Sequence, residues 1–127
     1  MEIIGIGLDA TEVPRVADVI ARHGDHFLTR IFTAGEIAYC QAHRHAAQHF
    51  AARFAVKEAA MKALGTGFSQ GVVWRDIEVV RRGGPPQLQL HGVAAQHFAS
   101  LGGRTSAITI THTETLAMAH VILMGER

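Results

Sequence analysis

The sequence has one cysteine, few aromatic residues and no long hydrophobic run, and each shortage excludes a class of protein. Its only cysteine, Cys40, can form no disulfide within the chain, which argues against a disulfide-stapled secreted fold. Aromatic residues make up 6% of the chain and accompany no basic stripe, so a nucleic-acid-binding module is set aside. Because neither a membrane span nor a secretory leader is recognisable, we expect a cytoplasmic protein with no membrane partner.

An excess of charge is missing too. Twelve Lys and Arg residues against eleven Asp and Glu residues give a formal net charge of +1. Any acidic partner must therefore be met by a local basic patch. Hydrophobic residues make up 48% of the chain and charged residues 18%, which is typical of a folded globular protein. At this length we expect one domain over residues 1–127.

The N-terminal segment reads as a strand with one bare side. Period-two alternation divides residues 3–9 into two faces, with Ile4, Ile6 and Leu8 on one and Gly5, Gly7 and Asp9 on the other. Glycine weakens a strand, so its use here indicates that another backbone or a ligand approaches closely. Asp9 stands at the end of this strand, and Thr11 is expected to cap the following helix, with Pro14 in its first turn.

Residues 48–64 predict a long central helix that ends at the turn Gly65-Thr66-Gly67. Its apolar residues fall into one stripe and its alanines into a second, close-packing face. The stripe consists of Phe50, Phe54, Met61 and Leu64, and the alanine face of Ala51, Ala55, Ala59 and Ala63.

The remaining elements are shorter. Thr33 and Glu36 have the spacing of a capping box, which predicts a helix start. Residues 74–82 and 87–90 predict a hairpin, 93–101 a short helix, and 105–113 and 116–124 two strands. The last strand is apolar on both faces, which predicts burial within the fold or at a subunit contact.

Two acidic residues on different elements are the candidate chemical groups. Asp9 at a strand end and Glu58 on the central helix can converge on a hard cation such as Mg²⁺, with water and phosphate completing its shell. The same helix carries Arg53, Lys57 and Lys62, and such cations suit a bridging pyrophosphate. Phosphoryl chemistry is the class that these residues favour.

Each of these features also has a simpler interpretation. Glu58 and Lys62 at i,i+4 are a common surface ion pair, and Gly65-Thr66-Gly67 is a common helix stop. His112 fits a hydrogen-bonded core residue as well as a ligand-binding one. The crowded His43, His45 and His49 suggest either a metal site or, more readily, solvated surface histidines.

Two longer motifs resemble those of a known protein family. Gly5-Ile-Gly-Leu-Asp9 is followed by Arg15, and the central helix reads Arg53-Phe-Ala-Val-Lys57-Glu58-Ala-Ala-Met-Lys62-Ala-Leu-Gly65-Thr-Gly67. With Arg30-Ile-Phe-Thr33, Gly84-Pro-Pro86 and Ile110-Thr-His112-Thr113 in the same order, the chain resembles the holo-acyl-carrier-protein synthases. These are the small class of phosphopantetheinyl transferases.

The resemblance implies a fold and an activity. The fold is a single small α+β domain, with the long helix packed on an antiparallel sheet, assembled into a homotrimer with active sites between subunits. The activity is Mg²⁺-dependent transfer of 4'-phosphopantetheine from coenzyme A to a serine of apo acyl carrier protein, for fatty acid or polyketide biosynthesis, with Mn²⁺ as a possible substitute. The rival interpretation is a coenzyme A-binding trimer that has lost catalysis.

The resemblance also assigns residues to roles. The catalytic residues would be Asp9, Glu58 and Lys62, of which Asp9 and Glu58 bind the metal. Coenzyme A would be held by Arg44, Arg53, Lys62, Gly65, Thr66, Pro86, His112 and Thr113. Arg15 and Arg22 would dock the acidic carrier protein. Thr109, His45 and His26 depart from residues common in the family, which leaves affinity and carrier preference open.

Overall fold

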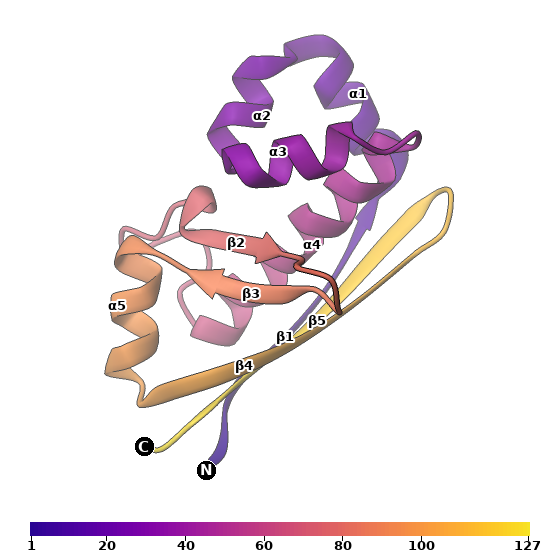
Figure 1. Ribbon diagram of the computed structural model, residues 1–127. Helices are drawn as coiled ribbons and strands as arrows, with labels where there is room; N and C mark the ends of the chain where they lie inside the picture. The colour runs from indigo at the N-terminus through magenta and orange to yellow at the C-terminus, as the bar shows by residue number, and fades with distance from the viewer.

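A long helix lying across a three-stranded antiparallel sheet organises the computed structural model, which describes residues 1–127 (Figure 1). The sheet has the order β1-β5-β4, and a separate hairpin pairs β2 with β3. The elements in chain order are β1 (Glu2–Glu12), α1 (Val13–His23), α2 (Asp25–Ile31), α3 (Ala34–Gln41), α4 (Ala46–Leu64), the 3-10 turn η1 (Trp74–Asp76), β2 (Ile77–Val80), β3 (Gln87–Leu90), α5 (Gly92–Ser100), β4 (Gly103–His112) and β5 (Leu116–Gly125).

The two ends of α4 are covered by different elements. Helices α1, α2 and α3 gather around its first half, while the β2–β3 hairpin and α5 lie beside its second half (Figure 1). Both chain termini lie at the same end of the sheet, since Glu2 pairs with Gly125. The predicted α+β class, with a central helix on an antiparallel sheet, is confirmed.

The glycines of β1 let the strand approach the backbone of α4. A Cβ atom at Gly5 would collide with the carbonyl oxygen of Ala63, and one at Gly7 with that of Ala59. Ala59 is fully buried and Ala63 nearly so. Only small side chains fit on the face of the helix that the strand approaches this closely. The close approach and the alanine face predicted from the sequence are therefore confirmed, and the partner is a helix backbone.

The predicted grouping of the β1 isoleucines is wrong in one respect. The pairing of β1 with β5 shifts register between Ile3 and Gly5, so Ile4 turns into the core. Ile6 and Leu8 instead point outward and are 61% and 57% exposed. The outer face of the sheet thus carries an apolar strip in the single chain.

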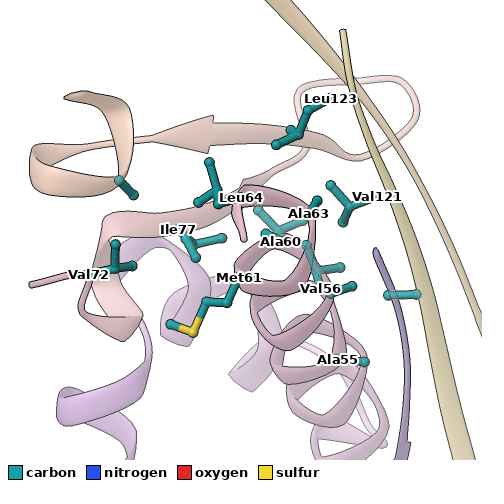
Figure 2. Close-up of a cluster of buried hydrophobic side chains, with 14 of the residues drawn as sticks. Ala55, Val56, Ala60, Met61, Ala63, Leu64, Val72, Ile77, Val121 and Leu123 are labelled. Carbon is teal, nitrogen blue, oxygen red and sulfur yellow. The ribbon is translucent and has the colours of Figure 1, made fainter. Parts of the chain in front are cut away.

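The core consists of two clusters. Figure 2 shows the first, in which side chains from α4, such as Met61 and Leu64, meet Ile77 and the β5 residues Val121 and Leu123. The second surrounds Phe32 and Phe50 and also contains Cys40. Burial raises the pKa of the Cys40 thiol to about 12, so this cysteine stays unreactive. β5 contributes to both clusters through its inner face, as expected for one of its two apolar sides.

Lys57 lies inside the protein, contrary to the prediction that it joins a phosphate-binding group of cations. Its side chain is fully buried, and its ammonium donates to Glu36 Oε1 at 2.7 Å and to the carbonyls of Trp74 and Ile77. Glu36 also closes the predicted capping box with Thr33 and accepts from the Val79 amide. The pair ties α3, α4 and β2 together, because every strong donor and acceptor in it is engaged.

Several boundaries differ from the prediction. Thr11 lies in β1 and donates to Asp9 Oδ2, while Glu12 precedes α1 without a side-chain cap; Pro14 is in the first turn as expected. The segment 25–31 forms α2, which the pattern did not indicate. The first hairpin strand begins only at Ile77. None of the helices has the length and unbroken apolar sequence that a bilayer crossing requires.

The contact between β1 and α4 gives a direct stability test. Gly7→Ala should destabilise the fold by about 3 kcal/mol or more, because the new methyl group must push the strand away from the Ala59 carbonyl. Urea unfolding measures this change. Gly84→Ala is the matched control, since no atom lies within 4 Å of a Cβ at that position. Equal midpoints for the two variants would contradict the proposed close packing.

Candidate functional site

The end of β1 and the middle of α4 form one pocket that is lined by three acidic residues, Asp9, Glu12 and Glu58. Its volume is about 430 Å³, and α1 and α2 close its sides. The lining residues are Asp9, Ala10, Thr11, Glu12, Arg15, Val16, Val19, Phe27, Phe54 and Glu58. Asp9 and Glu58, which were predicted to converge from different elements, therefore do so in the folded chain.

Asp9 is held on both of its oxygens. Thr11 Oγ1 donates to Oδ2 at 3.0 Å, and Lys62 Nζ lies 3.3 Å from Oδ1. Lys62 also donates to the carbonyl of Leu8 at 3.0 Å. Since the Lys62 side chain is 53% exposed, its ammonium can leave Asp9 and move to an incoming anion at little cost.

Glu58 is the strained partner in this pocket. Partial burial raises the pKa of Glu58, the negative charge of Asp9 raises it further, and Lys62 opposes the rise. Two carboxylates held close in a half-buried pocket repel one another. A cation placed between them would relieve that repulsion.

The donor set fits a hard divalent cation that is completed by other ligands. Asp9 and Glu58 offer carboxylate oxygens, which Mg²⁺ prefers, and Mg²⁺ normally keeps waters or phosphate oxygens in its remaining positions. No group of three or more His, Cys, Asp and Glu side chains is arranged for metal binding anywhere in the chain. The protein alone would therefore supply only part of the coordination shell.

A second pocket lies on another side of α4. Its volume is about 320 Å³, and it is formed by α3, α4, the turn after β2, and β4. The lining residues are Tyr39, His49, Ala52, Arg53, Arg81, Pro85, Pro86, Ile108, Thr109, Ile110 and His112. Three of the predicted coenzyme A contacts, Arg53, Pro86 and His112, meet here. His112 is exposed at this pocket, so the core interpretation of that residue is wrong.

Aromatic rings stack along one wall of this second pocket. The His43 and His49 ring centroids are 4.1 Å apart, Tyr39 lies 4.6 Å from His43, and His112 lies 5.5 Å from His49. Burial, followed by the positive charges nearby, lowers the pKa of His49 to about 4, so its ring is neutral near pH 7. His45 is exposed, as expected for a solvated surface histidine, whereas His43 and His49 are partly buried at this wall.

The two pockets share no lining residue. Arg53 faces the second pocket while its neighbour Phe54 faces the first, because successive residues of a helix point about 100° apart. A single chain thus separates the carboxylates from the arginine and histidine that were assigned to the same ligand.

The other predicted residues are spread around these pockets. Arg15 lines the carboxylate pocket, while Arg22 lies farther along α1 and pairs with Asp18 at 3.2 Å. Gly65 is the left-handed cap of α4, and the buried Thr66 follows it, donating to the carbonyl of Gly67. Neither residue lines the two pockets.

Arg44 is exposed and also lines neither pocket. The Thr113 hydroxyl accepts from the amides of Thr115 and Leu116, so in this chain it shapes the turn before β5.

Several pocket residues were not assigned to the site from the sequence, among them the acidic Glu12 in the first pocket. Tyr39 and Arg81 reach the second pocket from elements far apart in the sequence, and Phe27 and Thr11 line the first. The alternation Asp9, Thr11 along one strand is a signal for Thr11, since both side chains then point to the same side. Tyr39 has the weaker signal of standing near the crowded histidines, and Phe27 has none because α2 was not predicted.

Known proteins resemble this chain along nearly its whole length. A family model described as the 4'-phosphopantetheinyl transferase superfamily, ACPS, matches residues 5–117. A curated holo-acyl-carrier-protein synthase from Koribacter versatilis is 55% identical over 122 residues, covering 95% of this chain and 98% of that protein.

Solved structures give the same result. The holo-acyl-carrier-protein synthase of Neisseria meningitidis has a TM-score of 0.86 at 28% identity, covering 96% of this chain and 98% of that chain. The Bacillus anthracis protein, in complex with coenzyme A (3',5'-ADP), has a TM-score of 0.80 at 30% identity, covering 99% of this chain and all of that one.

The raised pKa of Glu58 predicts that its ionised carboxylate lowers the stability of the folded chain when no cation is bound. A carboxyl group whose pKa is higher in the folded state stabilises the fold most at low pH and loses that contribution as pH rises through the folded pKa. In buffer that contains a metal chelator, the variant Glu58→Gln should therefore have a higher melting temperature than the wild type at about pH 7.5. The difference in melting temperature should be smaller at about pH 4.5.

Differential scanning fluorimetry with and without Mg²⁺ checks this prediction. Mg²⁺ should raise the melting temperature of the wild type and not that of Glu58→Gln. A variant that melts lower than the wild type at both pH values would show that the carboxylate is stabilised, and not strained, by its surroundings.

Proposed function

The chain belongs to the 4'-phosphopantetheinyl transferase superfamily, and from this premise we propose that it is a holo-acyl-carrier-protein synthase. It transfers the 4'-phosphopantetheine arm of coenzyme A to a serine of apo acyl carrier protein. The observation that carries the proposal is the pocket in which Asp9 and Glu58 lie together with Lys62 beside them. This combination suits a pyrophosphate bridged by a cation.

The reaction forms one bond to phosphorus and breaks one. The serine oxygen attacks the phosphorus next to pantetheine, the bond from that phosphorus to the bridging oxygen breaks, and adenosine 3',5'-bisphosphate leaves with the electron pair. The serine proton goes to an acceptor, for which Glu58, Lys62 acting as a relay, and solvent are the candidates. Mg²⁺, when bound, would neutralise the charge of the pyrophosphate.

The residues in and around the carboxylate pocket would have different roles in binding. Asp9 and Glu58 would hold the cation, and Mn²⁺ would suit the same oxygen ligands. Lys62 would exchange its contact with Asp9 for a phosphate oxygen. Arg15 at the pocket and Arg22 beyond it would guide the acidic carrier protein, so that its serine enters beside Glu58.

The nucleotide end of coenzyme A would be bound by the second pocket of a neighbouring subunit. Arg53, Pro86 and His112 line a different pocket from Asp9 and Glu58 of their own chain, which supports this assignment. The exposed apolar strip on the sheet, which includes Ile6, Leu8 and Met118, offers a surface through which copies would assemble into a homotrimer. Arg44, Gly65, Thr66 and Thr113 complete the proposed coenzyme A contacts.

This activity places the protein in a cellular setting. Holo acyl carrier protein is the form that carries acyl chains, so the reaction would supply fatty acid or polyketide biosynthesis. Both substrates are soluble, which agrees with a cytoplasmic enzyme.

The intact mass of an apo acyl carrier protein tests the activity. Incubation with this protein, coenzyme A and Mg²⁺ should add one phosphopantetheine. Asp9→Ala and Glu58→Gln should each slow the reaction by about 100-fold or more, because each removes a group that stabilises the transferring phosphate. Asp25→Asn, which changes an exposed acidic residue outside the pocket, should keep the wild-type rate.

A chelator should abolish the mass gain in every case. Absence of any gain with several carrier proteins, despite measurable coenzyme A binding, would favour a coenzyme A-binding protein without catalysis.

A mixing experiment tests whether the site is shared between subunits. Asp9→Ala and Arg53→Ala should each have low activity at coenzyme A concentrations below KM. Co-expression of the two variants with different tags should restore activity in mixed trimers, because one interface can combine an intact Asp9 with an intact Arg53. Random mixing of equal amounts gives about a quarter of the wild-type sites.

The matched control is a mixture of Asp9→Ala with Glu58→Gln. Both substitutions fall in the same pocket, so a site built from one copy of that pocket gains nothing. Restoration in this control, or none in the first mixture, would contradict the shared site.

A further inference from the structure

The Arg53 side chain is buried without an acidic partner. It is 4% exposed, it donates no hydrogen bond within the chain, and its Nε has no partner at all. No carboxylate lies within ion-pair distance of it. A buried charge without a counter-ion is costly, so something else in the structure must favour its position.

The neighbouring acidic residues are committed elsewhere. Glu36 pairs with Lys57, and Glu78 accepts from the Thr33 hydroxyl and contacts His91 at 2.8 Å. Glu78 lines a small cavity next to Arg53 without reaching it. The guanidinium therefore has no acidic partner within the chain, and its N–H donors stay free.

Tyr39 supplies the missing support. Arg53 Cζ lies 4.0 Å from the centroid of the Tyr39 ring, which is the geometry of a cation–π contact. The ring is fixed in turn by its neighbours, because its centroid lies 4.6 Å from that of His43 and 5.9 Å from that of His49. His43 Nδ1 also lies 2.7 Å from the Tyr39 carbonyl oxygen.

Contact with an aromatic ring, rather than with a carboxylate, leaves Arg53 able to bind an anionic ligand. A carboxylate partner would neutralise Arg53 and use the N–H donors that recognise a phosphate. An aromatic face holds the guanidinium plane through its π-electrons and leaves the donors at the edge unengaged. The Arg81 side chain lines the same pocket and adds a second positive charge.

We propose that Tyr39 is a positioning residue which holds Arg53 ready for the phosphorylated nucleotide end of coenzyme A, and so sets the preference for coenzyme A over 3'-dephospho-coenzyme A. This inference rests on the proposed function. It adds a residue of α3 to the determinants of substrate specificity. Tyr39 itself touches Arg53 and the histidine rings, and acts on the ligand through Arg53.

The variants Tyr39→Leu and Tyr39→Phe separate positioning from packing. Tyr39→Leu should raise KM for coenzyme A about tenfold with kcat changed less than about twofold, because the lost contact affects binding before and during the reaction alike. Its preference for coenzyme A over 3'-dephospho-coenzyme A should fall by a similar factor. Tyr39→Phe keeps the aromatic face and should behave as the wild type in both measurements.

Phe98→Leu is the control for loss of an aromatic side chain. Phe98 packs against the first core cluster and lines neither functional pocket. It should lower the melting temperature and leave KM for coenzyme A unchanged. The inference is overturned if Tyr39→Leu behaves like Phe98→Leu, or if Tyr39→Phe loses affinity as Tyr39→Leu does.

Calorimetric titration with coenzyme A and with 3'-dephospho-coenzyme A keeps this test independent of catalysis. A wild type that binds coenzyme A but modifies no carrier protein would refute the proposed reaction, while the comparison of Tyr39 variants would still stand. Equal dissociation constants of the wild type for the two ligands would refute the role of Tyr39 even if transfer is observed.

Discussion

The structure depends on the contact between the glycines of β1 and the backbone of α4. Gly5 and Gly7 face the carbonyl groups of Ala63 and Ala59 with no room for a side chain on the strand. This contact fixes the distance between two elements that are far apart in the sequence. Asp9, two residues beyond Gly7 on the same side of β1, is thereby brought to Glu58 on α4, so the packing that builds the core also builds the carboxylate pocket.

Three charged side chains of α4, all within residues 53–58, lie in three different electrostatic environments. Lys57 is buried and fully satisfied by Glu36 and backbone carbonyls, while the adjacent Glu58 is half-buried beside Asp9 and strained. Arg53 is buried too, yet an aromatic ring replaces its acidic partner. Stability and function are therefore separated by helix face: the satisfied ion pair holds the fold, and the unsatisfied groups remain available to charged ligands.

The parts of the fold that the sequence predicts are those with local causes. The capping box at Thr33, the glycine cap at Gly65 and the alanine face of α4 follow from spacing alone, and all are confirmed. The pairing of Asp9 with Glu58 was predictable because a strand end and a helix face with matched small residues can meet. Lys57 was misjudged because its partner Glu36 lies on another helix, and no local pattern distinguishes a buried lysine from an exposed one. The register shift near Gly5, which turns Ile6 outward, depends on pairing with β5 and is equally non-local.

In the proposed shared site, the separation of the two pockets would connect the outward-facing apolar strip with catalysis. A ligand as long as coenzyme A has a pyrophosphate and a nucleotide that need different surroundings, one acidic with a cation and one basic with aromatic walls. Placing both sets of residues in one pocket would set Arg53 beside Asp9 and Glu58, where the charges would neutralise each other. Keeping them on different sides of α4 preserves both potentials, and assembly of copies through the sheet can then bring the basic pocket of one chain to the acidic pocket of the next. On this view the exposed Ile6 and Leu8 are a requirement of the site rather than a weakness of the fold.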